Sequence, residues 1–181
     1  KEAAAFSAVS VEHAAGTTEI EEEPERIYVL DLVALDIVDN LGYGDRVVGV
    51  MEQRSVPSYL EDYFNNEDIA VLPMVSSSSA DADDDEEGED PSDVYYTIDA
   101  DLIIGGGSQS GDYELLSEIA PTVIVYSSAY ANAASDEGTV IESVEKNASV
   151  IGQIFGKEDE VEAMIDDYTD RTEALKAAVS Q

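Results

Sequence analysis

Hydrophobic positions fall into short apolar runs separated by amphipathic segments. Five runs are rich in β-branched residues, as expected of buried strands: residues 26–31, 46–50, 69–75, 100–106 and 121–126. Elsewhere the apolar spacing changes to three or four residues, which predicts helices over residues 32–42, 56–64, 111–120, 137–156 and 157–180. Strands that are apolar almost throughout are typical of a parallel sheet covered on both faces.

Strands alternate with helices through residue 126, which predicts an α/β fold with right-handed crossovers. We expect a Rossmann-like parallel five-stranded sheet flanked by helices. The last helix is too long for an ordinary crossover between strands, and its length is typical of a helix that connects one structural unit to another. The predicted division is an N-terminal extension or strand in residues 1–22, an α/β lobe in residues 23–156, and a long helix in residues 157–181.

The segment "SSSSADADDDEEGED" (76–90) interrupts this pattern, with eight acids among residues 81–90. Mutual repulsion and the lack of apolar groups predict a solvated acidic loop over residues 76–91. A calcium-binding loop is the alternative interpretation, but the glycine and the distal glutamate do not have the spacing that such a loop requires.

Composition removes several function classes. The 42 acids against 8 bases give a net charge of −34, which disfavours nucleic acid and anionic membranes as partners. Without cysteine, thiolate catalysis and cysteine zinc sites are excluded. The single histidine, His13, is expected in the core or in an N-terminal strand. The small-residue start "KEAAAFSAVS" is typical of an exported protein after removal of its targeting segment, and equally of a trimmed chain.

The stretch "DLIIGGGSQSGDYELL" (101–116) carries three consecutive glycines between a strand and a helix. A phosphate loop would need a lysine, and a dinucleotide fingerprint would need other glycine spacing after the first strand. Ligands of open α/β sheets bind outside the carboxyl ends of the strands. The turns there offer an arginine, hydroxyls, amides and a tyrosine, but no nucleophile beside a base. This inventory favours binding over catalysis, with Ser108 and Gln109 as hydrogen-bonding groups.

Two other functions stay open at this point. A metal-dependent hydrolase of the α/β class could hold magnesium through acids such as Asp31 and Asp36. An acidic cation-binding interaction module could act through residues 81–90.

The order of motifs resembles the iron-siderophore (class III) substrate-binding proteins of ABC transporters, a class that also includes cobalamin and haem binders. The resemblance covers nearly all of residues 11–175 and rests on four stretches in sequence order. These are "VEHAAGTTEIEEEPERIYVLDLVALDIVDNLGYGDRVVGV", "IDADLIIGGG", "LSEIAPTVIV" and "NASVIGQIFGKEDEVEAMIDDY". It implies that the chain is an N-terminal lobe whose final helix is the interdomain backbone helix leading to a C-terminal lobe.

The function implied by the resemblance is capture of an iron-siderophore, or of haem or a corrinoid, and delivery to an ABC permease, with no catalytic residue, resident metal or cofactor. Arg54 is the expected charged contact, because a guanidinium pairs with the oxygens of a ferric chelate. The other expected ligand contacts are Met51, Ser76, Ser108, Gln109 and Tyr126. The implied location is extracytoplasmic, as a periplasmic protein or a cell-surface lipoprotein.

Two positions depart from the family pattern. Several siderophore binders carry an arginine where this chain has Ser108. Its absence disfavours a highly anionic catecholate complex and leaves neutral or less charged chelates, corrinoids and haem open as ligands. The family's permease-docking glutamate corresponds here to Asp93, with Glu89 and Asp90 close by in sequence. These three acids are the expected permease-docking residues.

Overall fold

A computed structural model of the chain describes residues 6–75, 91–126 and 137–179. Its centre is a five-stranded sheet with the order β5-β4-β3-β6-β7, in which all neighbours are parallel. The strands are β3 (Ile27–Val29), β4 (Val47–Met51), β5 (Ala70–Leu72), β6 (Leu102–Gly105) and β7 (Thr122–Ile124). The predicted parallel five-stranded α/β sheet is therefore confirmed. Four of the strands are shorter than their apolar runs, and β4 begins and ends one residue later than predicted.

The strand order reverses between β3 and β6. From β3 the chain adds β4 and then β5 on one side, and it returns to place β6 and β7 on the other. The peptide N–H of Leu30 donates to the carbonyl of Ile104 at 2.8 Å, so the pairing of β3 with β6 continues past the end of β3. This junction is the switch point at which ligands of such sheets bind.

Helices connect and cover the strands. The α-helices are α1 (Leu32–Asn40), α2 (Glu61–Asn65), α3 (Tyr113–Ile119), α4 (Glu137–Phe155) and α5 (Glu158–Val179). The 3₁₀ helices are η1 (Gly44–Arg46), η2 (Ser58–Leu60), η4 (Pro91–Thr97) and η5 (Gly107–Asp112). The single helix predicted over residues 56–64 is instead η2 followed by α2. The polar part of the glycine turn forms η5, because its glycines and serines disfavour an α-helix.

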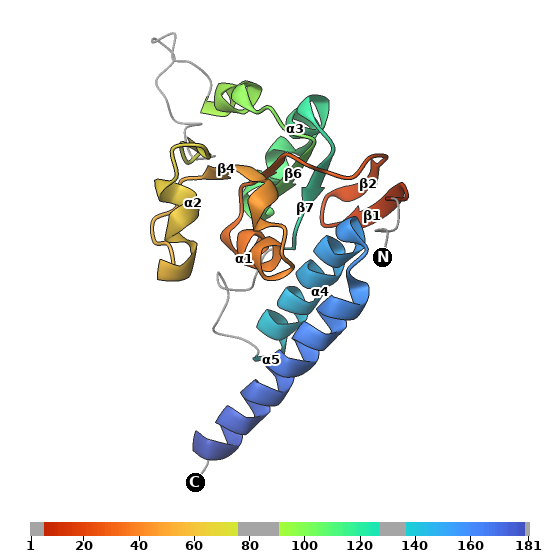
Figure 1. Cartoon of the computed structure of the whole chain (residues 1–181), viewed down its shortest axis with the longest axis vertical. Coiled ribbons are helices and arrows are strands. Elements are labelled where there is room, and N and C mark those ends of the chain that lie inside the picture. Colours follow the sequence, from red (N-terminus) through yellow and green to blue (C-terminus); the bar gives the residue numbers. More distant parts are fainter. Residues whose placement is uncertain (1–5, 76–90, 127–136, 180–181) are drawn as a thin grey trace.

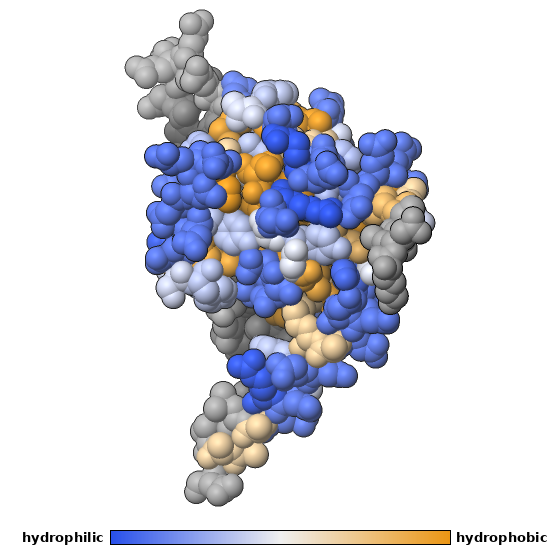
Figure 2. All heavy atoms as spheres, in the orientation of Figure 1, coloured by the Kyte–Doolittle hydropathy of each residue, from blue (hydrophilic) through white to orange (hydrophobic). Residues whose placement is uncertain are grey.

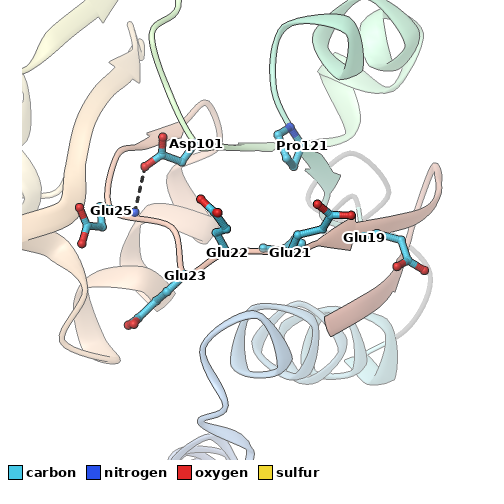
Figure 3. Close-up of a pocket in the computed structure, with 8 residues that line it drawn as sticks. Glu19, Glu21, Glu22, Glu23, Glu25, Asp101 and Pro121 are labelled. Carbon is cyan, nitrogen blue, oxygen red and sulfur yellow. Dashed lines mark hydrogen bonds between the residues drawn. The ribbon is translucent and has the colours of Figure 1, made fainter. Parts of the chain in front are cut away.

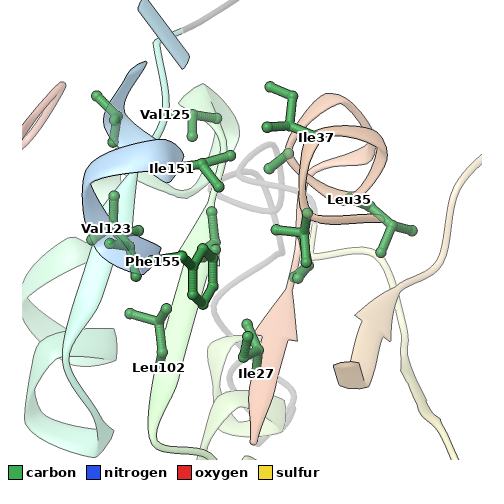
Figure 4. Close-up of a cluster of buried hydrophobic side chains, with 14 of the residues drawn as sticks. Ile27, Leu35, Ile37, Leu102, Val123, Val125, Ile151 and Phe155 are labelled. Atoms are coloured by element: carbon green, nitrogen blue, oxygen red, sulfur yellow. The ribbon is translucent and has the colours of Figure 1, made fainter. Parts of the chain in front are cut away.

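Both faces of the sheet are buried along β3, β4, β6 and β7, as the continuous apolar strands predicted, whereas the edge strand β5 is mostly exposed. Alternate residues of β3 point to opposite sides, Ile27 and Val29 to one and Tyr28 to the other. The first face packs against α1 and α4, where Ile151 and Phe155 lie over the strands (Figure 4). The second face is covered by side chains from η4 and α3. The sheet thus has a hydrophobic core on each face, and packing on both sides fixes the positions of its strand ends.

A hairpin of β1 (Val9–His13) and β2 (Gly16–Ile20) lies beside β7 and was predicted only as an extension or strand. The N–H of Ala14 donates to the carbonyl of Ile124 at 2.9 Å. His13 is buried and its Nε2 lies 2.9 Å from the hydroxyl of Thr18. The expectation of a histidine in the core and in an N-terminal strand is confirmed.

Helices α4 and α5 lie side by side, and α5 extends past the rest of the described chain (Figure 1). Val161, near its start, is buried against α4, whereas Tyr168 is exposed. Most of the visible face is hydrophilic, with smaller apolar areas between the charged groups (Figure 2). Among the residues that the structure describes, no helix has the length and apolar character needed to cross a membrane.

Candidate ligand-binding edge of the sheet

The turns that leave the strands form what we name the carboxyl edge: residues 30–31, 52–55, 73–75, 106–109 and 125–126. Because all five strands are parallel, these turns lie at one end of the sheet. We name the opposite end the amino edge: residues 19–26, 44–46, 99–101 and 121. Every described residue predicted to contact a ligand belongs to the carboxyl edge or, like Met51, ends a strand there.

Asp31 and Gly106 meet at the switch point. Asp31 begins α1, and its Oδ1 accepts the N–H groups of Val33 at 2.9 Å and Ala34 at 3.0 Å. Burial raises the pKa of the Asp31 carboxyl, while these two N–H groups act in the opposite direction. A side chain at position 106 would place its Cβ 2.3 Å from Asp31 Oδ2, so only glycine fits there.

Gln109 and Met51 join the turn after β6 to the end of β4. Gln109 Oε1 accepts the N–H of Gly106 at 2.9 Å, and its Nε2 lies 3.5 Å from Met51 Sδ. The two residues are only 2% and 3% exposed. The structure therefore brings this predicted pair together, but it engages their polar atoms inside the protein. Their contact with a ligand stays a prediction, and holding Gly106 in place is the role that their geometry supports.

Arg54 and Ser108 are both exposed on the carboxyl edge, in the turns after β4 and β6. Arg54 forms none of the four ion pairs found among the described residues. The contact of these two exposed side chains with a ligand remains a prediction. Three other predicted residues, Ser76, Glu89 and Asp90, lie outside the described residues, as does most of the acidic loop.

Tyr126 is held by a residue that the sequence did not identify. The N–H of Tyr126 donates to Asn147 Oδ1 at 2.7 Å, and Asn147 Nδ2 donates to the Tyr126 carbonyl at 3.0 Å. Asn147 lies in α4 and is buried. Its side-chain amide satisfies the backbone hydrogen bonds of Tyr126 that a neighbouring strand would otherwise make. Lys146 stands over the Tyr126 ring, with Nζ 5.6 Å from the ring centre. The sequence signal that could have identified Asn147 is a polar residue at a position of the predicted helix where an apolar one is expected.

Asp93 is not among the residues of the carboxyl edge. It is exposed on η4, in the segment that enters β6 at its amino end. Its predicted contact with a permease is not one that a single chain can exhibit, and it stays a prediction.

The structure does not arrange Asp31 and Asp36 as ligands of a magnesium ion. Asp31 gives Oδ1 to the start of α1, and Asp36 accepts the Asn40 side chain on the same helix at 3.1 Å. Within residues 6–75, 91–126 and 137–179, no three acids or histidines are grouped as metal ligands. Burial also raises the pKa of Asp36, which disfavours its charged form.

The amino edge contains a hollow of about 730 Å³ with a different character. Its lining includes six acids, namely Glu19, Glu21, Glu22, Glu23, Glu25 and Asp101. The glutamates come from β2 and the segment that follows it, and Asp101 faces them from the start of β6 (Figure 3). Asp101 Oδ2 accepts the N–H groups of Glu25 and Arg26, both at 3.1 Å.

A second hollow lies along α1. This groove of about 740 Å³ is lined mainly by apolar side chains from α1, η2, α4 and α5. Its rim carries Arg171, which pairs with Asp167 at 3.4 Å. The groove therefore offers apolar contact area and no unpaired base.

Comparison with known proteins relates this geometry to a family. Residues 98–181 match the family described as "Periplasmic binding protein". The petrobactin-binding protein YclQ of Bacillus subtilis is 32% identical over 146 residues, covering 80% of this chain and 38% of that protein. The ferric-anguibactin-binding protein FatB of Vibrio anguillarum is 27% identical over 176 residues, covering 96% of this chain and 49% of that protein.

Solved structures agree with the sequence relatives. The siderophore-binding protein BauB, bound to ferric iron and two acinetobactin molecules, has a TM-score of 0.72 at 27% identity; the match covers 94% of this chain and 54% of that one. The catecholate-siderophore-binding protein VctP of Vibrio cholerae has a TM-score of 0.65 at 28% identity, over 88% of this chain and 50% of that one. The chain thus spans about half the length of these proteins, or less. Its match to the periplasmic binding protein family over residues 98–181, and its similarity to siderophore-binding proteins, agree with the resemblance in its sequence.

Proposed function

We propose that the protein is the solute-binding component of an ABC importer, which captures a ferric siderophore and delivers it to a membrane permease. One observation carries this proposal. In a chain of net charge −34, the switch point of the sheet has a glycine floor, and the exposed Arg54, in the turn after the neighbouring strand β4, forms no ion pair with a described carboxylate. The likeness to BauB, a protein holding a ferric siderophore complex, supports the same function.

Each part of the carboxyl edge has a role in this proposal. Gly106 lets a bulky ligand approach the backbone, and Gln109 holds that turn against Met51. The Arg54 guanidinium pairs with the carboxylate, catecholate or hydroxamate oxygens of the chelate. Ser108 and Tyr126 supply hydroxyl groups. The ferric ion enters with its chelator as cargo, so the protein needs no metal ligands of its own.

The proposed activity contains no chemical step. Catalysis of hydrolysis would require a nucleophile beside a base, or grouped metal ligands, at the carboxyl edge. There Asp31 serves the start of α1, and its buried carboxyl has a raised pKa. A buried carboxyl whose oxygen already accepts the N–H groups of a helix start is a poor magnesium ligand. Binding and release are the functions that the remaining groups support.

The proposal extends to a two-lobed protein in which α5 is the rigid arm to a second lobe. The relatives, about twice as long as this chain, support this architecture. The cleft would then close over the carboxyl edge, while Asp93, Glu89 and Asp90 would meet basic groups of the permease. We place the protein outside the cytoplasmic membrane, with a lipid anchor as the finer expectation.

Titration of the full-length protein tests the proposal. Ferric petrobactin, a ferric tris-hydroxamate, haem and cobalamin are added in turn while tyrosine emission is recorded. A ferric siderophore should quench the emission with a submicromolar Kd, and the iron-free siderophore should bind more weakly. If only haem or only cobalamin binds, that molecule, and not a siderophore, is the ligand of the protein. No binding of any of the four would reject the proposed function.

A further inference from the structure

The basic residues of this chain divide into two groups. Of its eight Lys and Arg residues, six have side chains that the structure describes. Four of those six form ion pairs: Arg26 with Asp99, Arg46 with Glu23, Lys157 with Glu160 and Arg171 with Asp167. Arg54 and Lys146 form none with any described carboxylate. With 42 acids in the chain, an unpaired base is the exception.

Of the two bases without a partner among the described carboxylates, Arg54 belongs to the carboxyl edge, and Lys146, on α4, contacts Tyr126 of that edge. Arg54 follows β4, and Lys146 stands over Tyr126, which follows β7. The position of Tyr126 is fixed because Asn147 bonds both its N–H and its carbonyl. Lys146 is exposed, and its helix neighbours Glu142 and Glu145 form no ion pair with it.

The two bases flank the floor of the candidate site. In the order β4-β3-β6-β7, the outer strands are three strand spacings apart. At about 4.8 Å per spacing, the strands that lead to Arg54 and to Tyr126, the residue Lys146 contacts, lie about 14 Å apart. Gly106 follows β6, one of the two strands between them. A chelate resting on the glycine turn therefore has a cationic group on either side.

We propose that Lys146, supported by Tyr126, is a second contact for the ligand, and that the ligand is an anionic chelate whose acidic oxygens reach both flanks of the edge. This inference rests on the proposed function and specifies its ligand class. The Lys146 ammonium has three donors, and its interaction with the Tyr126 ring leaves them free to point toward ligand oxygens. A ligand without negative charge would form no ion pair with either base.

The test compares an anionic ferric tris-catecholate with an uncharged ferric tris-hydroxamate, titrated into the full-length protein. Lys146→Gln should weaken binding of the tris-catecholate about tenfold, the usual effect of losing one charge-assisted contact. Its affinity for the tris-hydroxamate should stay within about twofold. Lys146→Arg, which keeps the charge, should retain most of the catecholate affinity. Lys157→Gln removes a base that already pairs with Glu160 and should change neither affinity.

The outcomes separate the two claims. If the unaltered protein binds neither chelate nor any other siderophore, the proposed function fails. If it binds a siderophore but prefers the uncharged one, or if Lys146→Gln binds the tris-catecholate as tightly as the unaltered protein, only the present inference is overturned. An equal loss for both chelates would assign Lys146 a structural role and also overturn it. Thermal unfolding of each variant identifies such a loss of structure.

Discussion

The two ends of the sheet treat charge in opposite ways. At the amino edge, Arg26 and Arg46 pair with Asp99 and Glu23, at 3.0 Å and 2.9 Å, and a hollow lined by six acids lies beside them. Arg54 of the carboxyl edge, and Lys146, which contacts Tyr126 of that edge, have no carboxylate partner among the described residues. Both edges belong to the same strands, so the difference does not arise from the fold. Under the proposed function, the bases at the carboxyl edge serve to bind the ligand.

The edges also differ in how their turns are held. At the carboxyl edge, buried side chains fix the backbone: Asp31 at the start of α1, Gln109 at Gly106, and Asn147 at Tyr126. At the amino edge, Asp101 holds the N–H groups of Glu25 and Arg26 from an exposed position. A preorganised turn binds with a smaller loss of conformational entropy. Rigid support is therefore concentrated where we place the ligand.

The largest predicted effect concerns Asn147. Asn147→Ala removes both hydrogen bonds to the Tyr126 backbone and leaves two peptide groups without their partner. The free energy of unfolding should fall by about 3 kcal/mol in chemical denaturation. Ser149→Ala, in which the lost hydroxyl bonds only to its own helix, should change it by less than about 0.5 kcal/mol. Equal effects would show that Asn147 does not hold the edge.

The next effect comes from Gly106. In Gly106→Ala the new Cβ meets the Asp31 carboxylate at 2.3 Å, and Asp31 cannot move without losing its bonds to α1. We expect a loss of about 2 kcal/mol in unfolding free energy and weaker ligand binding. Gly111→Ala has open space and serves as the matched control. A Gly106→Ala variant as stable as that control would contradict the close approach.

Arg54 tests the contrast between the edges through binding. Arg54→Gln should lower the affinity for an anionic ferric chelate about tenfold, close to 1.4 kcal/mol, with little change in thermal stability. Arg26→Gln, which removes a paired arginine from the amino edge, should leave that affinity unchanged. The contrast breaks if the two variants lose affinity equally, which isothermal titration calorimetry would detect.

The smallest effect lies at neither edge. Burial lowers the pKa of His13, so the folded state takes up its proton at lower pH than the unfolded chain, whose pKa is near 6.5. The stability that His13 contributes is complete above pH 6.5 and is lost as the pH falls below it. Between pH 6.5 and 5.5 the loss is at most about 1 kcal/mol. A His13→Gln variant should lack this part of the pH dependence in denaturant titrations, and an unchanged profile would assign it to other groups.

Local pattern predicted the framework of the fold. The apolar runs identified all five parallel strands, because strands buried on both faces have little polar interruption. The hairpin of β1 and β2 was missed because "VSVEH" and "GTTEI" alternate apolar and polar residues over only a few positions. The 3₁₀ helix η5 was missed because its conformation depends on Gln109 reaching back to Gly106.

The site was predicted less completely, since it depends on distant contacts. Arg54 stood out as a base in an acidic chain, whereas Lys146 and Asn147 read as ordinary helix residues. Both residues contact Tyr126, which is about twenty positions away in the sequence, and these contacts exist only in the folded chain. The same holds for Met51 and Gln109, which are 58 positions apart. Sequence shows which groups are available, and packing decides which of them face a ligand.

Hydrogen exchange of the full-length protein, with and without a ferric siderophore that it binds, tests the central claim most directly. If the carboxyl edge holds the ligand, the amides of residues 52–55 and 106–109 should exchange more slowly in the complex, while those of residues 19–25 at the amino edge should be unaffected. Slower exchange confined to residues 19–25 would contradict the account and assign the ligand to the acidic hollow.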